Sequence, residues 1–168
     1  MSGIPGLTSR ALAGLLAAAL VLPAWASGAL QDLGSGQTRS LEDFLGKGKW
    51  TVVMFWVSDC PICNQEAPAW SVFDARHRGK DAEVVGLSLD GLAGKKAAKA
   101  FVERHLVDFP NLIGEPEAVA RMFTERGRSP FLGTPSFLVY SPSGELKARQ
   151  VGPLPPERLE EYIRKQSQ

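Results

Sequence analysis

A run of almost entirely apolar residues covers positions 50–57, and it is rich in β-branched and aromatic side chains. A continuous run of this kind is typical of a central strand that is buried on both faces of a sheet. Pro61 follows in a position where a first-turn proline is tolerated, and apolar residues at helical spacing continue to about residue 78. Pro68 lies inside this helix and predicts a kink. The pattern therefore predicts a buried strand that leads directly into a long helix.

The rest of the chain alternates between strand and helix patterns. Strands are predicted at 29–33, 83–89, 135–140 and 145–151, with a short extended piece at 109–114. Helices are predicted at 40–45, 94–106, 115–124 and 157–166, with a loop at 125–133 and a hairpin turn at 141–144. Strands separated by helices form a parallel sheet, and a terminal hairpin adds an antiparallel edge. The order predicts an α/β fold with a mixed central sheet.

Residues 1–26 differ in composition from the rest of the chain. Arg10 is their only charge, an apolar run covers 11–22, and Ala24, Trp25 and Ala26 follow as a small-x-small pattern. These features predict a secretory signal peptide that is cleaved after about Ala26. An uncleaved anchor and a buried apolar helix are the alternatives. The expected organisation is a signal peptide, 1–26, and one domain, 27–168.

Composition narrows the class of protein. The chain has 168 residues, of which 44% are hydrophobic and 22% charged, so one domain can bury an ordinary core without disulfide staples. The formal net charge is +1, and the sequence has no basic stripe. We therefore expect no nucleic-acid partner, and a monomer is the simplest expectation for the assembly.

The two cysteines, Cys60 and Cys63, lie two residues apart at the predicted strand-to-helix junction. A helix N-terminus favours the thiolate form, so the first thiol is expected to be acidic and exposed. A disulfide across so small a loop adds little chain entropy to the fold, which argues against a purely structural role. His77 and His105 have no zinc-ligand spacing relative to the cysteines, so we expect no zinc site. A Cu(I) carrier needs only two soft ligands and stays an alternative.

The motif Trp56-x-x-x-Cys60-Pro61-Ile62-Cys63, combined with Gly133-Thr134-Pro135 and a later hairpin and helix, resembles the thioredoxin fold over residues 28–168. Within that superfamily the chain most resembles the exported TlpA/ResA-like thiol–disulfide oxidoreductases, which include the cytochrome c maturation reductases. Two features carry this resemblance. Glu66 occupies the position of an acidic residue beside the active site of those proteins, and the stretch 91–115 corresponds to their inserted helix and strand.

The resemblance implies roles for the matching residues. Cys60 becomes the nucleophile and Cys63 the resolving thiol, and Thr134-Pro135 becomes a cis-proline turn that faces the disulfide. Trp56, Thr134 and Pro135 are the expected substrate-binding residues.

The chain also departs from the family pattern. Pro61-Ile62 replaces the usual pair between the cysteines, and Asp59 replaces a frequent aromatic residue. Met54 stands where thioredoxin has a buried aspartate, so Glu66 becomes the candidate proton acceptor, with a pKa raised by burial.

Negative charge near the thiols and the absence of a side-chain donor at Pro61-Ile62 favour a reductant over a strong oxidant. We expect a periplasmic reductase of protein disulfides, such as those of apocytochrome c or a copper site, that receives electrons from a membrane thiol–disulfide reductase. The expected electron carrier is the Cys60–Cys63 disulfide itself, without a cofactor or metal. The alternatives are a thiol oxidase or isomerase on the same fold and a Cu(I)-binding chaperone.

Overall fold

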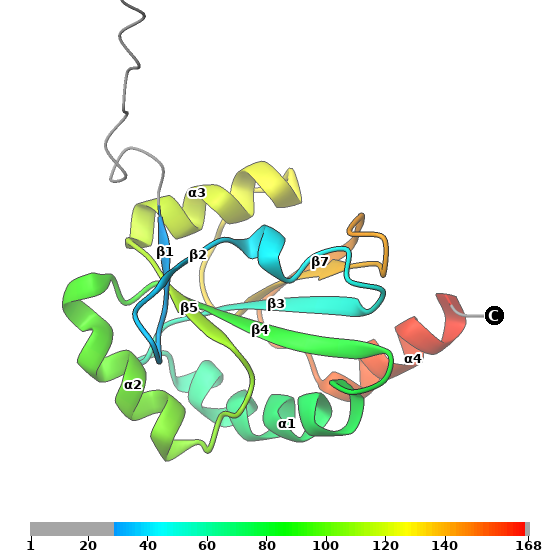
Figure 1. Cartoon of the computed structure of the whole chain (residues 1–168), viewed down its shortest axis with the longest axis horizontal. Coiled ribbons are helices and arrows are strands. Elements are labelled where there is room, and N and C mark those ends of the chain that lie inside the picture. Colours follow the sequence, from blue (N-terminus) through cyan, green and yellow to red (C-terminus); the bar gives the residue numbers. More distant parts are fainter. Residues whose placement is uncertain (1–28, 167–168) are drawn as a thin grey trace, which may run out of the picture.

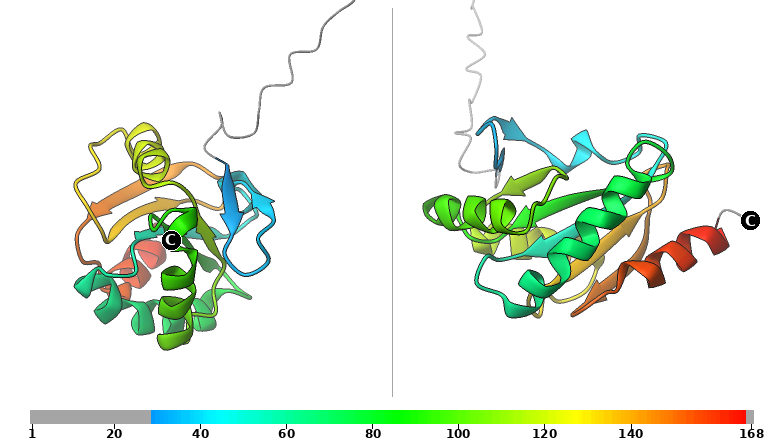
Figure 2. Two further views of the ribbon diagram at one scale, coloured as in Figure 1. Left: turned by 90° about the vertical axis from the view of Figure 1, so that its left-hand side faces the viewer. Right: turned by 90° about the horizontal axis from the view of Figure 1, so that it is seen from below.

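The computed structural model describes residues 29–166, in which seven strands form a single sheet with helices on both faces. The strands are β1 Leu30–Asp32, β2 Thr38–Arg39, β3 Trp50–Trp56, β4 Ala82–Ser88, β5 Asn111–Ile113, β6 Ser136–Tyr140 and β7 Leu146–Val151. The helices are α1 Pro61–His77, α2 Lys95–Arg104, α3 Pro116–Gly127 and α4 Pro156–Gln166, with short 3-10 helices η2 Leu41–Asp43 and η3 Leu92–Gly94. Helices α1, α2 and α4 lie on one face of the sheet and α3 on the other (Figures 1 and 2).

The expected signal peptide, 1–26, lies outside the described residues. Within residues 29–166, no helix combines the length and apolar character that a membrane crossing requires.

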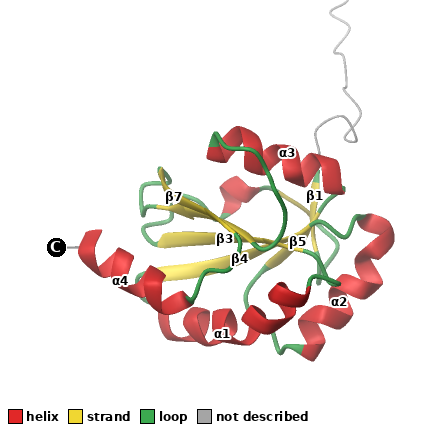
Figure 3. Cartoon of the chain, turned by 180° about the vertical axis from the view of Figure 1, so that it is seen from behind, coloured by secondary structure: helices red, strands yellow, loops and turns green. Residues whose placement is uncertain are grey.

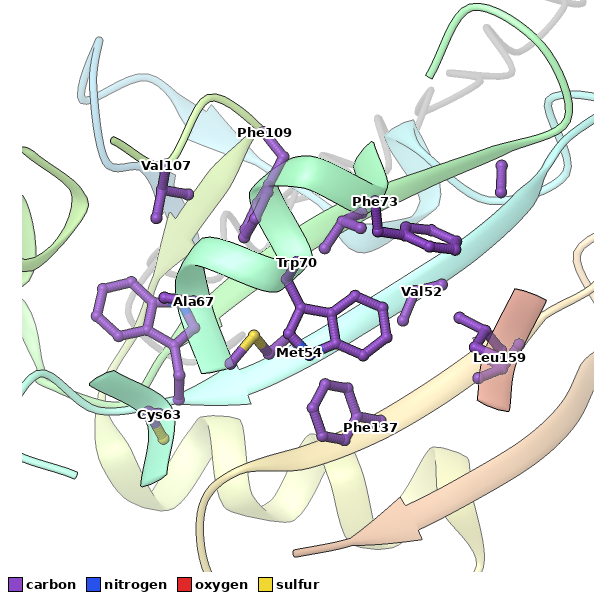
Figure 4. Close-up of a cluster of buried hydrophobic side chains, with 14 of the residues drawn as sticks. Val52, Met54, Cys63, Ala67, Trp70, Phe73, Val107, Phe109, Phe137 and Leu159 are labelled. Carbon is purple, nitrogen blue, oxygen red and sulfur yellow. The ribbon is translucent and has the colours of Figure 1, made fainter. Parts of the chain in front are cut away.

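Strand β3 is the centre of the sheet, as its apolar pattern predicts. It pairs in parallel with β4 and antiparallel with β6, and all seven of its residues are buried. Because side chains alternate along a strand, Val52, Met54 and Trp56 face the layer of α1, α2 and α4. Val53 and Phe55 face the layer of α3. Figure 4 shows part of the first cluster, in which Met54, Cys63 and Trp70 belong to one group of buried side chains.

Asp74 ties the long helix α1 to the sheet. Its side chain is 1% exposed and accepts a hydrogen bond from the Val84 backbone N–H at 2.8 Å. It also pairs with Arg78, one turn further along the helix. A buried carboxylate needs such partners, and these hold α1 in register against β4. The helix runs continuously through Pro68, and the kink expected there stays a prediction.

The N-terminal extension and the central insertion meet at one edge of the sheet. β1 pairs antiparallel with β5, and β5 pairs in parallel with β4. The two-residue strand β2, which pairs with β1, is absent from the sequence-based prediction because both of its residues are exposed and show no apolar pattern. The extension and the insertion therefore support each other rather than forming separate appendages.

Three predicted helices differ from the structure in their extent. Helix α2 ends at Arg104, two residues before its predicted end. Helix α3 runs to Gly127, three residues past the predicted end, because Phe123 and Gly127 are buried against the sheet and extend its apolar face. The predicted loop at 125–133 is therefore wrong over its first three residues. The predicted short helix at 40–45 is a single 3-10 turn, capped by Ser40.

The C-terminal hairpin and helix follow the prediction. β6 and β7 form the antiparallel edge of the sheet, and α4 packs on the same side as α1 (Figure 3). Leu159 and Ile163 carry the buried face of α4 into the cluster that contains Cys63.

Candidate redox site

The two cysteines lie where β3 ends and α1 begins. Cys60 is the N-cap residue of α1, and Pro61 is the first helical residue. Cys60 and Cys63 form a disulfide with a Cα–Cα distance of 5.2 Å. The backbone N–H of Cys63 donates to Cys60 Sγ at 3.1 Å, so this sulfur takes the place of the oxygen that usually caps a helix. The helix dipole and this N–H both favour negative charge on Cys60 Sγ.

The two sulfurs differ in access. Cys60 is 8% exposed, whereas Cys63 is fully buried in the cluster shown in Figure 4. The first thiol is therefore less exposed than the sequence suggests, and the Thr134 carbonyl oxygen lies against its sulfur. Cys60 still has the only solvent-accessible surface of the pair.

The segment before β6 lies against the disulfide. The Thr134–Pro135 peptide bond is cis. The Thr134 carbonyl oxygen lies 3.5 Å from Cys60 Sγ. The segment is held by the Ser136 hydroxyl, which donates to the Gly133 carbonyl at 2.6 Å, and by the Gly152 N–H, which donates to the Pro135 carbonyl at 2.9 Å. Residues more than 70 positions apart in the sequence are thus in contact at the sulfur.

Glu66 is half-buried on α1. Its Oε1 accepts a hydrogen bond from the Leu154 backbone N–H at 2.9 Å, and its Oε2 is buried without a hydrogen-bond partner among residues 29–166. Burial raises the pKa of Glu66, and the Leu154 N–H opposes this rise without cancelling it. The carboxyl group therefore holds its proton to a higher pH than an ordinary glutamic acid.

Trp56 does not reach the surface. It is 1% exposed, stacks on Phe101 with ring centroids 4.3 Å apart, and donates from Nε1 to Asn111 Oδ1 at 3.1 Å. The expectation that Trp56 binds substrate is therefore wrong. The alternation of β3 points this side chain into the core, where it supports the site from beneath.

Two further side chains organise the turn before Cys60, and sequence reasoning did not find them. The Asp90 carboxylate accepts hydrogen bonds from the Ser58 backbone N–H at 3.2 Å and from the Ser58 and Ser88 hydroxyls. Asn64 donates from Nδ2 to the carbonyls of Ser58 and Cys60 at 3.1 and 2.8 Å. The position of Asn64 beside Cys63 was the one available signal for it, whereas Asp90 reaches the turn from 32 residues away.

Two exposed apolar side chains are close in sequence to residues of the redox site. Ile62, between the cysteines, is 39% exposed, and Leu132, two residues before Thr134, is 78% exposed. The arrangement provides an accessible sulfur, a buried second sulfur and, one turn further along α1, a carboxyl group with a raised pKa.

The fold and the CxxC disulfide at a strand-to-helix junction define a thioredoxin-fold redox protein. The family model described as AhpC/TSA matches residues 23–149, and the chain belongs to this family. Sporulation thiol-disulfide oxidoreductase A of Bacillus subtilis is 22% identical over 117 residues, which are 69% of this chain and 67% of that protein. Thiol-disulfide oxidoreductase ResA of Bacillus thuringiensis subsp. konkukian is 27% identical over 130 residues, 77% of this chain and 69% of the relative.

A solved structure supports the same fold. The secreted disulfide oxidoreductase of Mycobacterium tuberculosis, described as homologous to E. coli DsbE, superposes with a TM-score of 0.63 at 22% identity. The match covers 83% of this chain and 96% of that one. Together with the named relatives and the cysteine pair, these findings make the chain a thiol–disulfide oxidoreductase of the ResA type.

Proposed function

We propose that this protein is an exported reductase of protein disulfides in which Cys60 attacks and Cys63 resolves. One observation supports this direction of electron flow above the others. Among residues 29–166, Cys60 Sγ accepts a hydrogen bond from one N–H, that of Cys63, and it also lies 3.5 Å from the Thr134 carbonyl oxygen. A carbonyl oxygen repels a thiolate, so the stabilisation from the helix is partly offset. A weakly stabilised thiolate gives a stable disulfide and a more reducing couple.

The proposed exchange has two steps. The Cys60 thiolate attacks a substrate disulfide, forms a Cys60–substrate mixed disulfide and expels one substrate thiolate. The Cys63 thiolate then attacks Cys60 Sγ, expels the second substrate thiolate and leaves the Cys60–Cys63 disulfide. The substrate gains two electrons and the dithiol loses two, so the cysteine pair is itself the electron carrier and the reaction needs no further cofactor.

In this scheme Glu66 accepts the proton of Cys63. Cys63 is buried and must become a thiolate before it attacks, and Glu66 lies at position i+3 from it, on the adjacent part of the α1 surface. A carboxyl group with a raised pKa is better matched to proton transfer near neutral pH than an ordinary glutamate.

Replacing Glu66 by glutamine is expected to slow the second step, the attack of Cys63 on the mixed disulfide, about a hundredfold at neutral pH, because glutamine cannot accept the proton.

The same replacement is also expected to change how the stability of the protein depends on pH. The pKa of Glu66 is raised in the folded state, so the folded protein binds more protons than the unfolded one above pH 4.5, and wild-type stability falls as the pH rises through the folded pKa. The variant lacks this loss, so its stability relative to wild type should increase as the pH rises from 4 to 8.

Stopped-flow tryptophan fluorescence measures the first effect, and urea unfolding between pH 4 and pH 8 measures the second. Glu125→Gln is a matched control, since Glu125 is exposed on α3, on the far side of the sheet. Equal kinetics for Glu66→Gln and the control would remove Glu66 from the mechanism.

The expected substrate is a protein with an accessible disulfide. Ile62 and Leu132 offer apolar surface to it, and the segment at Thr134 and Pro135 lies next to the sulfur that it must reach. Export is supported by the sequence pattern of residues 1–26 and by the similarity to an oxidoreductase described as secreted. A membrane thiol–disulfide reductase is the proposed electron donor, because a dithiol in an oxidising compartment must be reduced again. A monomer is sufficient for this chemistry.

The reduction potential tests the direction of electron flow. Equilibration with glutathione or dithiothreitol, followed by alkylation of free thiols, is expected to give a value nearer to about −270 mV, as in thioredoxin, than to about −120 mV, as in strong oxidants. A potential close to −120 mV would replace the reductase with an oxidase on the same fold. Failure of the reduced protein to reduce any protein disulfide would overturn the proposal as a whole.

A further inference from the structure

Asn64, the fourth residue of α1, joins the redox turn to the inserted helix α2. Its Nδ2 donates to the Ser58 and Cys60 carbonyls at 3.1 and 2.8 Å. Its Oδ1 accepts from His105 Nε2 at 2.8 Å and from an Arg104 guanidinium N–H at 3.4 Å. One amide side chain therefore connects the end of α2 to the backbone of the residue that carries the accessible sulfur.

The orientation of the Asn64 amide is determined by its neighbours. The Ser58 and Cys60 carbonyls can only accept, and the Arg104 guanidinium can only donate. If the amide were reversed, its oxygen would face two carbonyl oxygens and its NH2 group would face a cation, so the reversed state is unfavourable. His105 must then donate from Nε2, which defines the protonated nitrogen of its ring.

His105 is itself held in place. Its ring packs edge-on against Phe101 with centroids 4.8 Å apart, and Phe101 stacks on the buried Trp56. Burial and the neighbouring Arg104 charge lower the pKa of His105. This column of rings gives the Nε2 donor a fixed position above Asn64.

Charged side chains lie on both sides of this bridge. Arg104 lies at the α2 end of the bridge, and the Asp90 carboxylate binds the Ser58 N–H and hydroxyl on the other side of the turn. Asp59 lies exposed within the turn and Glu103 is exposed on α2. Arg104 polarises the Asn64 amide through Oδ1, which strengthens the Nδ2 donors that hold the two carbonyls.

We propose that Asn64 is a positioning residue for the thiol–disulfide exchange, and that His105 and Arg104 of the inserted helix set its geometry. By holding the Ser58 and Cys60 carbonyls, Asn64 keeps Cys60 Sγ aligned with the Cys63 N–H, 3.1 Å away, and stabilises the Cys60 thiolate. The inference rests on the proposed function, because it assumes that Cys60 is the attacking thiol. It gives the insertion a role in tuning the redox couple in addition to its role in the sheet.

Asn64→Ala is expected to raise the pKa of the Cys60 thiol by about half a unit to one unit, because the thiolate loses its alignment with the helix N-terminus. The equilibrium constant for reduction of the disulfide by glutathione should fall about threefold to tenfold, and tenfold corresponds to about 30 mV towards a more reducing potential. The rate of iodoacetamide alkylation against pH reports the first quantity, and a glutathione titration reports the second.

A pair of substitutions at His105 separates positioning from packing. His105→Phe keeps an aromatic ring next to Phe101 but removes the donor. It should raise the pKa of the Cys60 thiol and lower the equilibrium constant for reduction of the disulfide by glutathione about two- to threefold. His105→Gln places an amide donor near the position of Nε2 and is expected to recover at least half of that shift. Gln65→Ala, an exposed neighbour on α1, is the matched control, and thermal unfolding confirms that each variant is folded.

The outcomes distinguish this inference from the function on which it rests. If wild type reduces protein disulfides but Asn64→Ala matches Gln65→Ala in thiol pKa and in the glutathione equilibrium, the positioning role is wrong and the function stands. If Asn64→Ala shifts both quantities while His105→Phe shifts neither, the coupling to α2 is wrong. If wild type shows no disulfide exchange, the proposed function fails first.

Discussion

A Cys63→Ala variant is expected to accumulate a covalent complex with its substrate through Cys60. Its buried partner thiol is missing, so the mixed disulfide formed by the accessible sulfur cannot be resolved. Cys60→Ala removes the attacking sulfur and should reduce protein-disulfide reductase activity to about a thousandth of wild type or less. Non-reducing electrophoresis of the exported proteins, followed by mass spectrometry of the captured species, measures the first effect and identifies the substrate.

The two variants form a matched pair, because each retains one cysteine of the same motif. Only the Cys63→Ala lane should contain high-mass species that disappear on reduction. A stronger set of adducts with Cys60→Ala would mean that Cys63 attacks first, in spite of its complete burial. That result would reverse the roles that we propose for the two thiols.

Gly86→Ala is expected to destabilise the protein by about 3 to 5 kcal/mol, a large share of the stability of a domain of this size. A Cβ at Gly86 would lie 1.9 Å from Asn111 Oδ1 and 2.8 Å from Trp56 Nε1. Those two atoms form a buried hydrogen bond of 3.1 Å, so the new methyl group must separate them or displace β4. Overpacking and the loss of a buried hydrogen bond each cost about 1 to 3 kcal/mol.

Urea unfolding at neutral pH measures this change. Gly79→Ala is the control, because a Cβ at Gly79 meets no atom within 4 Å, and its effect should stay within about 0.5 kcal/mol. A Gly86→Ala variant as stable as this control would show that the core can rearrange around Trp56. The redox turn above Trp56 would then depend less on this packing than the structure indicates.

The predictions from sequence succeeded where the signal is local. The apolar run at 50–57 predicts the buried strand β3, and Cys60 followed by Pro61 predicts the start of α1. These features depend on residues that are close together in the chain, so periodicity and helix-capping chemistry are sufficient to find them.

The errors of the sequence-based prediction arise where tertiary contacts determine which side chains are buried and where strands and helices begin and end. Trp56 lies next to the motif in sequence, but the alternation of β3 directs it into the core, against Phe101 and Asn111. Strand β2 exists only because β1 is there to pair with it. Helix α3 extends to Gly127 because the sheet offers a surface on which to bury another turn. Propensity alone is a weak guide at such positions.

The sequence by itself determined the class of chemistry, since two cysteines at a strand-to-helix junction specify a dithiol at a helix N-terminus. Only the tertiary structure decided which groups surround that dithiol. The Leu154 N–H at Glu66 and the His105 ring at Asn64 come from distant parts of the chain, and neither contact was expected from the sequence. Hydrogen bonds between such segments depend on how the sheet brings them together, and local sequence carries no record of them.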